Sequence, residues 1–570
     1  KCNSLTYFVL RTHKIGFKSI KSFKSSLNYA NGLVILVSSQ KYFNMRNFYS
    51  KLFFLLLPAI ASCQLYVGDA NTNSYVYNSG EIVFVTQDVN LQGAPDQDEG
   101  NFYLRDQGQL IQGDDSSANS GDGILSVTQK NYMNKWDFHY WASPVGDPKN
   151  TSTLEYAGTN TGNNFFYHEE DNNGGLYQID TEIESTAIPF TTSYDSFTDT
   201  DGYHYSSYWL YKYVKGNGTY SGWEQLDGNP LNPGEGYTMK GINDTPTPSG
   251  IPIDFRGRPN NGTINVDVVN GGLTLVGNPY PSAMNLSYYL LYNSGGDIST
   301  CLGTPNADVS TPTGPAVITG NAFFWESDPS VESHYFLDYE GGYGTFTPGT
   351  CNSEGTYAPA TFVEYGNDGN PIPGTETGDE GNPDLERHFA PVGQGFFVEG
   401  IANSVVTAKN QFRVFVKESR ANLSEFKSNG KSAQKNSSKS DKLDSKLMAG
   451  GQAMNERGYI VLPEFRLETF INNAYNRTIV GVMYENATLK TDRAMDGFNL
   501  SEISTDVSFK LEDTDRAVIT NYFPYDIEVK LPLKISGNNA TNTYRMIISS
   551  LNFTPDESIY LHDKLTDEYH

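Results

Sequence analysis

The chain has 570 residues, with 40 Lys and Arg against 66 Asp and Glu and a formal net charge of −26. This length predicts two to four domains, and the acidity argues against nucleic-acid binding, because no basic surface could neutralise phosphates. Charged residues make up only 19%, while Gly (54) and Tyr (38) are frequent. Such residues favour turns and exposed strand faces, so the composition predicts an all-β protein of β-sandwich (jelly-roll-like) domains with long Gly/Asn/Pro-rich loops.

Residues 1–63 contain nine Lys and Arg and no acidic residue, and the first Met is Met45. We expect residues 1–44 to be an untranslated or artefactual leader, with a genuine basic leader as the alternative. Residues 45–63 match a secretory signal peptide, with basic residues, an apolar run and small residues in that order. The apolar run is shorter than the roughly 20 residues that a membrane-spanning helix needs. We therefore predict an exported chain without a transmembrane span.

The cysteines allow two interpretations at the end of the signal peptide. Cleavage after Cys63 would leave Gln64 as the first residue, and we favour this reading; alternatively, residues 60–63 fit a bacterial lipobox in which Cys63 is lipidated. Only Cys301 and Cys351 then remain in the exported chain, and we expect them to form a disulfide. Two unpaired thiols are the alternative.

Short alternating runs rich in Val, Ile, Tyr and Phe recur after residue 64 and are bounded by Gly, Asn, Asp and Pro. This pattern predicts the strands of a sandwich or barrel. No stretch of twelve or more residues has a helical period, and only 287–292 is expected to form a helical turn. The clearest predicted strands are 75–77, 81–86, 208–214, 263–269, 272–276, 396–399 and 411–416.

An internal duplication is indicated at about 140–242 and 272–400. In each copy a Val-Gly-Asp/Asn-Pro sequence is followed by an aromatic segment with a Trp and then by a Gly-x-Gly-aromatic turn. The second copy carries an insertion at roughly 329–389. The alternative is that Gly-x-Gly-aromatic is an ordinary junction between a turn and a strand. The recurring sequences are 145–148 and 276–279, 208–210 and 323–325, and 234–237 and 393–396.

A change of composition marks residues 419–452, where six lysines are interleaved with Ser and Asn. We interpret this segment as a flexible linker, with a polyanion-binding arm as the alternative. It separates a β-rich region at 64–418 from a second β-rich domain at 453–570. The strand pattern of the second domain does not close before His570, so we expect that domain to be truncated.

The sequence has no recognisable catalytic motif, such as Gly-x-Ser-x-Gly, His-Glu-x-x-His or a P-loop. Its few His residues are scattered, and we expect them to be packed or exposed rather than ligands. The best metal candidate is a calcium loop with Asp195, Asp199 and Asp201 before Gly202, because Ca²⁺ prefers several oxygen ligands at a turn. An acidic turn without metal is the commoner alternative, so we predict no obligatory cofactor.

Exposed aromatic side chains could stack on sugars, although most Trp residues of a β-sandwich belong to the core. Trp223 lies between Gly222 and Glu224 in a polar segment and is the Trp that we expect to be exposed. It is therefore the candidate ligand-binding residue.

Several blocks resemble those of secreted surface proteins of flavobacteria and their Bacteroidetes relatives. Residues 141–146 (WASPVG) resemble a W-S-S-P-V-G block, and 254–262 with 275–283 resemble an F-R-G-x-P-N-x-G … L-x-G-N-P-Y-P-S-A pair. Residues 391–400 are similar to a P-x-G-Q-G-F-F-V turn. The resemblance covers most of 64–570. It implies export by the type IX secretion system, whose C-terminal sorting domain we expect to be lacking here, and it carries over no catalytic residue.

We therefore predict a non-enzymatic, secreted or cell-surface protein of a Gram-negative bacterium, with an adhesive or matrix role. Its partners would be the secretion machinery and glycans or cell-surface proteins. One alternative is a carbohydrate-binding accessory module, with or without calcium. A further alternative is a glycoside hydrolase with dispersed carboxylates, because the spacing of acidic groups in space cannot be read from the sequence.

Overall fold

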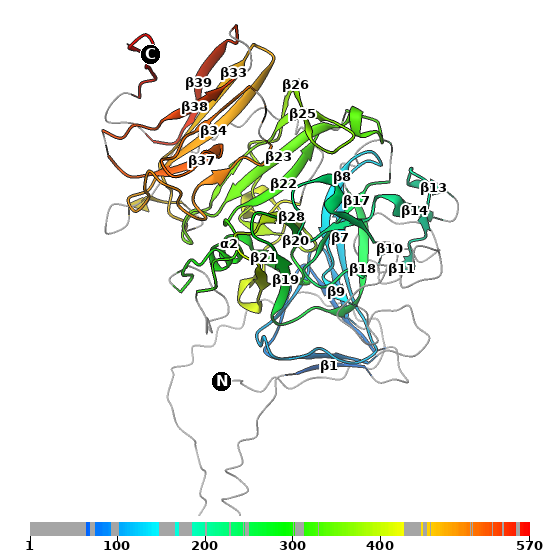
Figure 1. The fold of residues 1–570 in the computed structure, drawn as a ribbon. Coiled ribbons are helices and arrows are strands. Elements are labelled where there is room, and N and C mark those ends of the chain that lie inside the picture. The colour runs from blue at the N-terminus through cyan, green and yellow to red at the C-terminus, as the bar shows by residue number, and fades with distance from the viewer. Residues whose placement is uncertain are drawn as a thin grey trace, which may run out of the picture. The chain divides into compact units, whose positions relative to one another are not determined.

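The computed structural model (Figure 1) describes residues 64–570. The segments left out within that range are 69–73, 93–101, 147–165, 170–184, 200–201, 227–229, 243, 245–249, 300, 302–312, 329, 427–445, 448–452, 456–457, 502, 504, 527, 538–540 and 554–558. The expected leader, the signal peptide and Cys63 lie outside the described residues, as does most of the expected linker.

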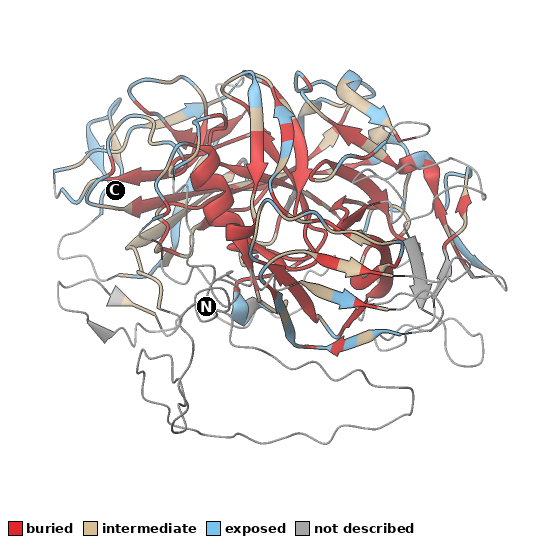
Figure 2. Ribbon diagram, turned by 90° about the horizontal axis from the view of Figure 1, so that it is seen from below, coloured by how far each residue is buried: buried red, intermediate tan, exposed pale blue. Residues whose placement is uncertain are grey.

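The prediction of an all-β fold is confirmed, because the described residues form many short strands and one α-helix. That helix, α2 (Leu286–Asn293), lies where a helical turn is predicted. It begins where the Asn285 side chain accepts a hydrogen bond from the Tyr288 N–H at 2.9 Å, which caps the helix. All of its residues are buried, as Figure 2 shows for the helix and the strands around it. None of the described helices is long and apolar enough to cross a membrane.

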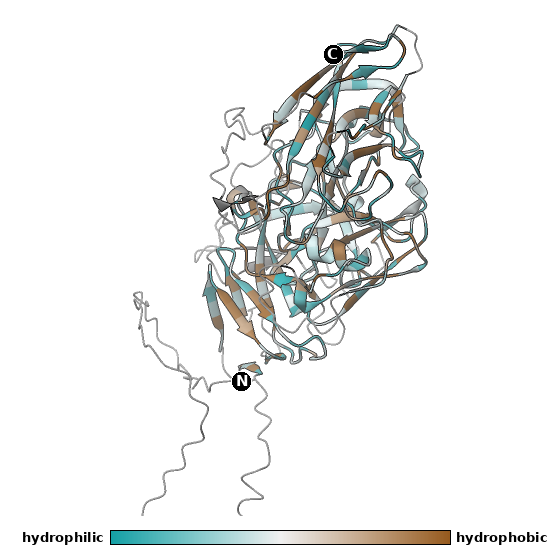
Figure 3. Ribbon diagram, turned by 90° about the vertical axis from the view of Figure 1, so that its left-hand side faces the viewer, coloured by the Kyte–Doolittle hydropathy of each residue, from teal (hydrophilic) through white to brown (hydrophobic). Residues whose placement is uncertain are grey.

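The first strands wind into a short stack of parallel coils (blue in Figure 1). The first coil contains β1 (Leu65–Val67), β2 (Val76–Ser79) and β3 (Ile82–Val85), and the second contains β4 (Val89–Leu91), β5 (Phe102–Arg105) and β6 (Gln109–Gln112). Each strand pairs in parallel with its equivalent one coil later, and β7 (Leu125–Asn131) continues from β5. These strands carry both hydrophobic and hydrophilic residues (Figure 3) but do not alternate strictly: β3 is hydrophobic throughout, and the two hydrophobic residues of β6 are adjacent. Parallel pairing is not anticipated by the sequence pattern.

The two predicted copies contain the same arrangement of four strands. In the first copy the sheet order is β16 (Trp223–Gln225), β15 (Tyr211–Tyr213), β17 (Gly236–Lys240), β8 (Phe138–Ala142). In the second copy the order is β23 (Glu340–Thr347), β22 (Ala322–Ser327), β28 (Gly395–Glu399), β20 (Leu273–Gly277). If the four strands of each copy are numbered in chain order, both sheets have the spatial order three, two, four, one. All neighbouring strands are antiparallel. This common topology supports the predicted duplication.

The Gly-x-Gly turns hold the two copies against each other. Each turn hydrogen-bonds to the first strand of the other copy: Ala142 N–H donates to Gly393 O at 2.8 Å, and Gly277 N–H donates to Gly234 O at 3.1 Å. The bridges Trp141–Gln394 and Glu235–Val276 repeat the same exchange. The contact is therefore reciprocal, as in a two-fold interface between identical subunits.

The blocks that resemble flavobacterial proteins form buried polar contacts. The Asn278 amide donates to the carbonyls of Ser282 and Pro391 at 2.7 and 2.9 Å. The fully buried Arg413 lies 4.7 Å from the centroid of the Tyr280 ring. Burial of such groups is tolerated only when they are paired. These residues therefore maintain the fold.

The third part of the chain is a sheet in the order β38 (Leu533–Ser536), β36 (Asp506–Phe509), β37 (Val518–Phe523), β34 (Tyr475–Met483), β33 (Glu464–Ile471), β39 (Tyr544–Leu551), shown in orange and red in Figure 1. Its apolar face packs against residues of the second copy's insertion, including Val363 and Tyr365. The predicted disulfide Cys301–Cys351 is formed, with 5.2 Å between the Cα atoms.

Candidate functional site

A group of aromatic side chains, which we call the aromatic patch, gathers on the first copy: Trp136, Tyr194, Tyr208, Trp209 and His334. Their ring centroids form a connected series with separations of 4.5 to 6.5 Å. Tyr194, Tyr208 and Trp209 come from the first copy and Trp136 lies just before it, whereas His334 belongs to the insertion of the second copy. The patch therefore depends on the contact between the two copies.

The patch is exposed at one side and buried at the other. Tyr194 and Tyr208 are 57% and 37% exposed, whereas Trp209 is buried. Tyr208 and Trp209 belong to a 3-10 turn at Ser207–Trp209, and the prediction of a continuous strand over 208–214 is wrong at these residues. The turn allows the Trp209 indole to donate to the Tyr194 carbonyl at 2.7 Å. This contact fixes two members of the patch relative to each other.

Beneath the patch lies a buried lysine at the end of β17. The amine of Lys240 lies 4.5, 4.1 and 4.9 Å from the ring centroids of Phe138, Trp209 and Tyr339. It also hydrogen-bonds to the Tyr339 hydroxyl. Contacts with three ring faces stabilise the charged amine, but burial opposes them and lowers the pKa of Lys240 well below its ordinary value.

His334 connects this lysine to the surface. Its Nδ1 lies 2.9 Å from Lys240 Nζ, and its Nε2 lies 2.8 Å from Asp195 Oδ1. If Lys240 donates to Nδ1, that nitrogen carries no proton, and the proton of the ring lies on Nε2, which donates to Asp195. His334 is then a neutral imidazole. Burial and the nearby Lys240 lower the pKa of His334, against the opposing effect of Asp195. The series Lys240–His334–Asp195 therefore keeps the His ring fixed against Trp209.

The rim of the patch provides polar groups of both signs. Lys135 lies 2.6 Å from Asp244 and 3.8 Å from Asp195, and its amine is 4.5 Å from the centroid of the Trp136 ring. The Trp136 indole nitrogen is buried and has no hydrogen-bond acceptor among the described residues. A ligand at this rim would find donors, acceptors and ring faces within a few ångströms.

The predicted calcium residues are not brought together among the described side chains. Asp195 pairs with His334 and Lys135. Asp199 ends β13 (Phe197–Asp199), but its side chain is not described, and Asp201 lies outside the described residues. In the part of the chain that the structure describes, no group of three or more His, Cys, Asp or Glu could hold a metal ion. The calcium loop stays a prediction.

Trp223, the predicted ligand-binding Trp, is half-buried in β16. It packs edge-on against Tyr213 and Phe397, with centroid separations of 5.0 and 5.8 Å, and forms a tilted contact with Tyr140 at 6.2 Å. It is not a member of the aromatic patch. Gln64, the expected first residue, donates to the Asp88 carboxylate near β1.

Sequence reasoning missed Lys240, His334 and Tyr194 as a group. They are more than forty residues apart in the chain and come together only through the contact between the copies. The one sequence signal for this group is Lys240, which ends a strand whose other residues are all buried. A lysine is rarely fully buried without a partner.

No curated protein and no solved structure matches the chain. A family model described as "Domain of unknown function (DUF8693)" matches residues 69–570, which is most of the chain. The protein therefore belongs to the family described as Domain of unknown function (DUF8693).

Proposed function

We propose that this chain is a non-enzymatic adhesion protein that binds glycans through the aromatic patch. The observation that carries the proposal is the connected group of rings, partly exposed through Tyr194 and Tyr208 and bordered by Lys135, Asp195 and Asp244. Aromatic faces pack against the C–H groups of a sugar ring, and charged rim residues hydrogen-bond to its hydroxyls.

The charge of the chain favours a neutral glycan. At a net charge of −26, a polyanionic partner would be repelled, and the patch itself carries both signs. The buried contacts beneath the rings, from Lys240 to Trp209 and from His334 to Asp195, hold the surface in one arrangement before a ligand arrives. A pre-ordered surface loses less conformational entropy on binding.

We further propose that the protein is exported and displayed on, or released from, the surface of a Gram-negative cell. The signal-peptide pattern at 45–63 and the resemblance to type IX secretion substrates support this location. The Cys301–Cys351 disulfide also fits an oxidising compartment. Fractionation of the native host tests it: the protein should be found in the outer-membrane or medium fraction, and a cytoplasmic location would contradict the proposal.

A glycan array on the purified protein, in calcium and in EDTA, tests the binding function. We expect Tyr194→Ala and Tyr208→Ala each to weaken the strongest glycan signal about tenfold, the loss expected for one aromatic contact. Tyr525→Ala is the matched control, because Tyr525 is 56% exposed but lies in the third part of the chain. Binding lost in EDTA would add the predicted calcium loop to the mechanism.

Two outcomes would contradict the proposal. One is equal loss of binding in the patch variants and in the Tyr525 control, which would place the ligand elsewhere. The other is release of new reducing ends from a bound polysaccharide, which would identify a hydrolase in place of an adhesion protein.

A further inference from the structure

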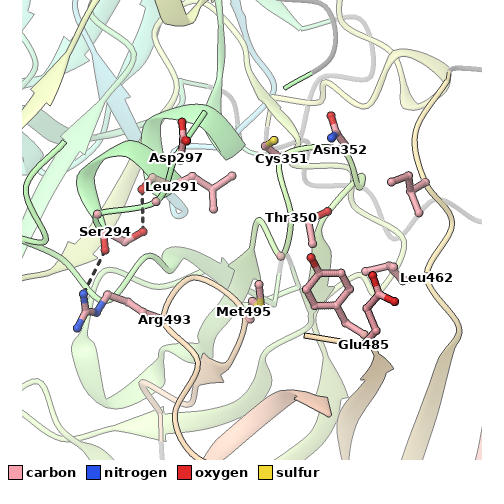
Figure 4. Close-up of a pocket in the computed structure, with 15 residues that line it drawn as sticks. Leu291, Ser294, Asp297, Thr350, Cys351, Asn352, Leu462, Glu485, Arg493 and Met495 are labelled. Carbon is pink, nitrogen blue, oxygen red and sulfur yellow. Dashed lines mark hydrogen bonds between the residues drawn. The ribbon is translucent and has the colours of Figure 1, made fainter. Parts of the chain in front are cut away.

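A cavity of about 620 Å³ (Figure 4) shares no lining residue with the aromatic patch. It is formed by the end of α2 with residues 294–297, by the disulfide segment 349–352, and by residues of the third part of the chain. This volume lies within the range of about 300–1,000 Å³ that is typical of small-molecule sites. Nothing in the proposed adhesive function uses it.

The cavity has an apolar wall. Leu291, Ile460, Leu462 and Met495 line it together with the ring of Tyr484. Leu291 comes from α2, whereas the others come from the third part of the chain. Such a wall can take an aliphatic or aromatic body, and burying that body supplies most of the affinity of a small ligand.

Two carboxylates stand at the rim without cationic partners. Asp297 accepts a hydrogen bond from Ser299 N–H at 2.8 Å, and Glu485 is exposed; neither forms an ion pair among the described residues. The third charged group, Arg493, donates to Ser294 O at 3.3 Å. Arg493 thereby compensates the carbonyl end of α2. The two carboxylates outnumber the one guanidinium, so the charged side chains of the lining sum to one negative charge.

One further polar atom in the wall has no partner. The Thr350 hydroxyl is buried, and it has no hydrogen-bond partner among the described residues. Buried polar atoms in folded proteins are nearly always paired with protein, water or ligand. Because the oxygen has almost no accessible surface, a ligand in the cavity would reach it only if the wall moved.

We propose that this cavity binds a small organic cation: an ammonium or guanidinium group carried on an apolar body. The cation would be attracted by both Asp297 and Glu485, and the body would pack on the apolar wall. The acidity of the whole chain would draw such ligands toward the surface and repel anions.

The test compares two probes that differ only in the charged group, 4-phenylbutylamine and 4-phenylbutanoate, by isothermal titration with the purified protein. We expect the amine to bind at least tenfold more tightly than the carboxylate. Asp297→Asn and Glu485→Gln should each weaken amine binding about three- to tenfold, the range expected for one partly exposed charge contact. Both side chains are exposed, so the variants should keep the melting temperature of the parent protein.

The matched control is Glu512→Gln, which removes an exposed carboxylate of the third part that does not line the cavity. It should leave amine binding unchanged. The proposal is overturned if the carboxylate binds as tightly as the amine, or if the Asp297 and Glu485 variants together bind the amine like the control. Leu462→Ala gives a separate check, because it should weaken both probes equally.

Discussion

The reciprocal contact between the two copies gives a prediction whose size follows from the structure. Gly395 and Gly236 occupy equivalent positions after the Gly-x-Gly turns. A Cβ atom on Gly395 would lie 2.8 Å from Trp141 N and 2.8 Å from Tyr140 C, and a Cβ atom on Gly236 would lie 2.9 Å from Val276 O. The Gly236 Cβ atom would also lie 2.7 Å from Leu275 Cγ, a side-chain atom. The other neighbours are backbone atoms, which cannot rotate away as the end of a side chain can.

We therefore expect Gly395→Ala and Gly236→Ala each to destabilise the protein by about 2 kcal/mol. Overpacking costs roughly 1–3 kcal/mol, and the backbone contacts place these sites at the upper end. Replacing Gly by Ala also restricts the unfolded chain, which returns about 0.4–1 kcal/mol. The two variants should have similar effects, because the two contacts are equivalent.

Urea unfolding followed by tryptophan fluorescence measures the effect, since Trp141 is fully buried at this contact. Gly366→Ala is the matched control: its Cβ would meet only the flexible end of Asp368 within 3.5 Å, and its φ lies outside the left-handed region. If Gly395→Ala and Gly236→Ala each cost less than about 0.5 kcal/mol, like the control, the contact does not hold the copies together.

Three further predictions concern other parts of the chain. Replacing Cys301 and Cys351 by Ser should cost about 4 kcal/mol, because the disulfide closes a loop with a sequence separation of 50; calorimetry with and without reductant checks this. Burial lowers the pKa of Lys240, so the free energy of unfolding should rise as the pH rises from that lowered pKa to about 10.5. Urea titrations at several pH values measure this rise, which should be absent in Lys240→Met. Burial raises the pKa of Asp496 to about 8, so the folded state holds a proton that the unfolded state loses near pH 4. Stability should therefore fall as pH rises from 4 to 8, and an equal fall in Asp496→Asn would show that another group is responsible.

Strands of the fold could be predicted from the sequence wherever one face of a strand is buried. The alternating run at 263–269 appears as β19 (Ile264–Val268), and that at 272–276 appears as β20. Alternation gives the side-chain period of a strand but says nothing of its partner. The parallel coils therefore could not be foreseen, since their strands pair across about 25 residues and two other strands lie between each pair.

The aromatic patch could not be predicted for a related reason. The acidic neighbours of Asp195 in the sequence predict a calcium loop, yet the structure places Asp195 beside His334, which is 139 residues away. Such a contact depends on the register of two sheets and on the contact between the copies. The disulfide was predictable because only two cysteines remained after the signal peptide, so no choice of partner was needed.

The parallel coils at the start of the described chain have a consequence for how related proteins can differ in length. The strands of each coil pair only with those of the next coil, but the second coil is also tied to later parts of the chain, since Leu110 N–H donates to Pro281 O at 2.9 Å. Whole coils of about 25 residues could therefore be added on the N-terminal side of the second coil without altering the sheets that follow. Coil number would then set how far the rest of the protein stands from its N-terminal end. Members of the family should thus vary at this end in whole coils, and a chain engineered with one duplicated coil should fold with its later disulfide and strands unchanged.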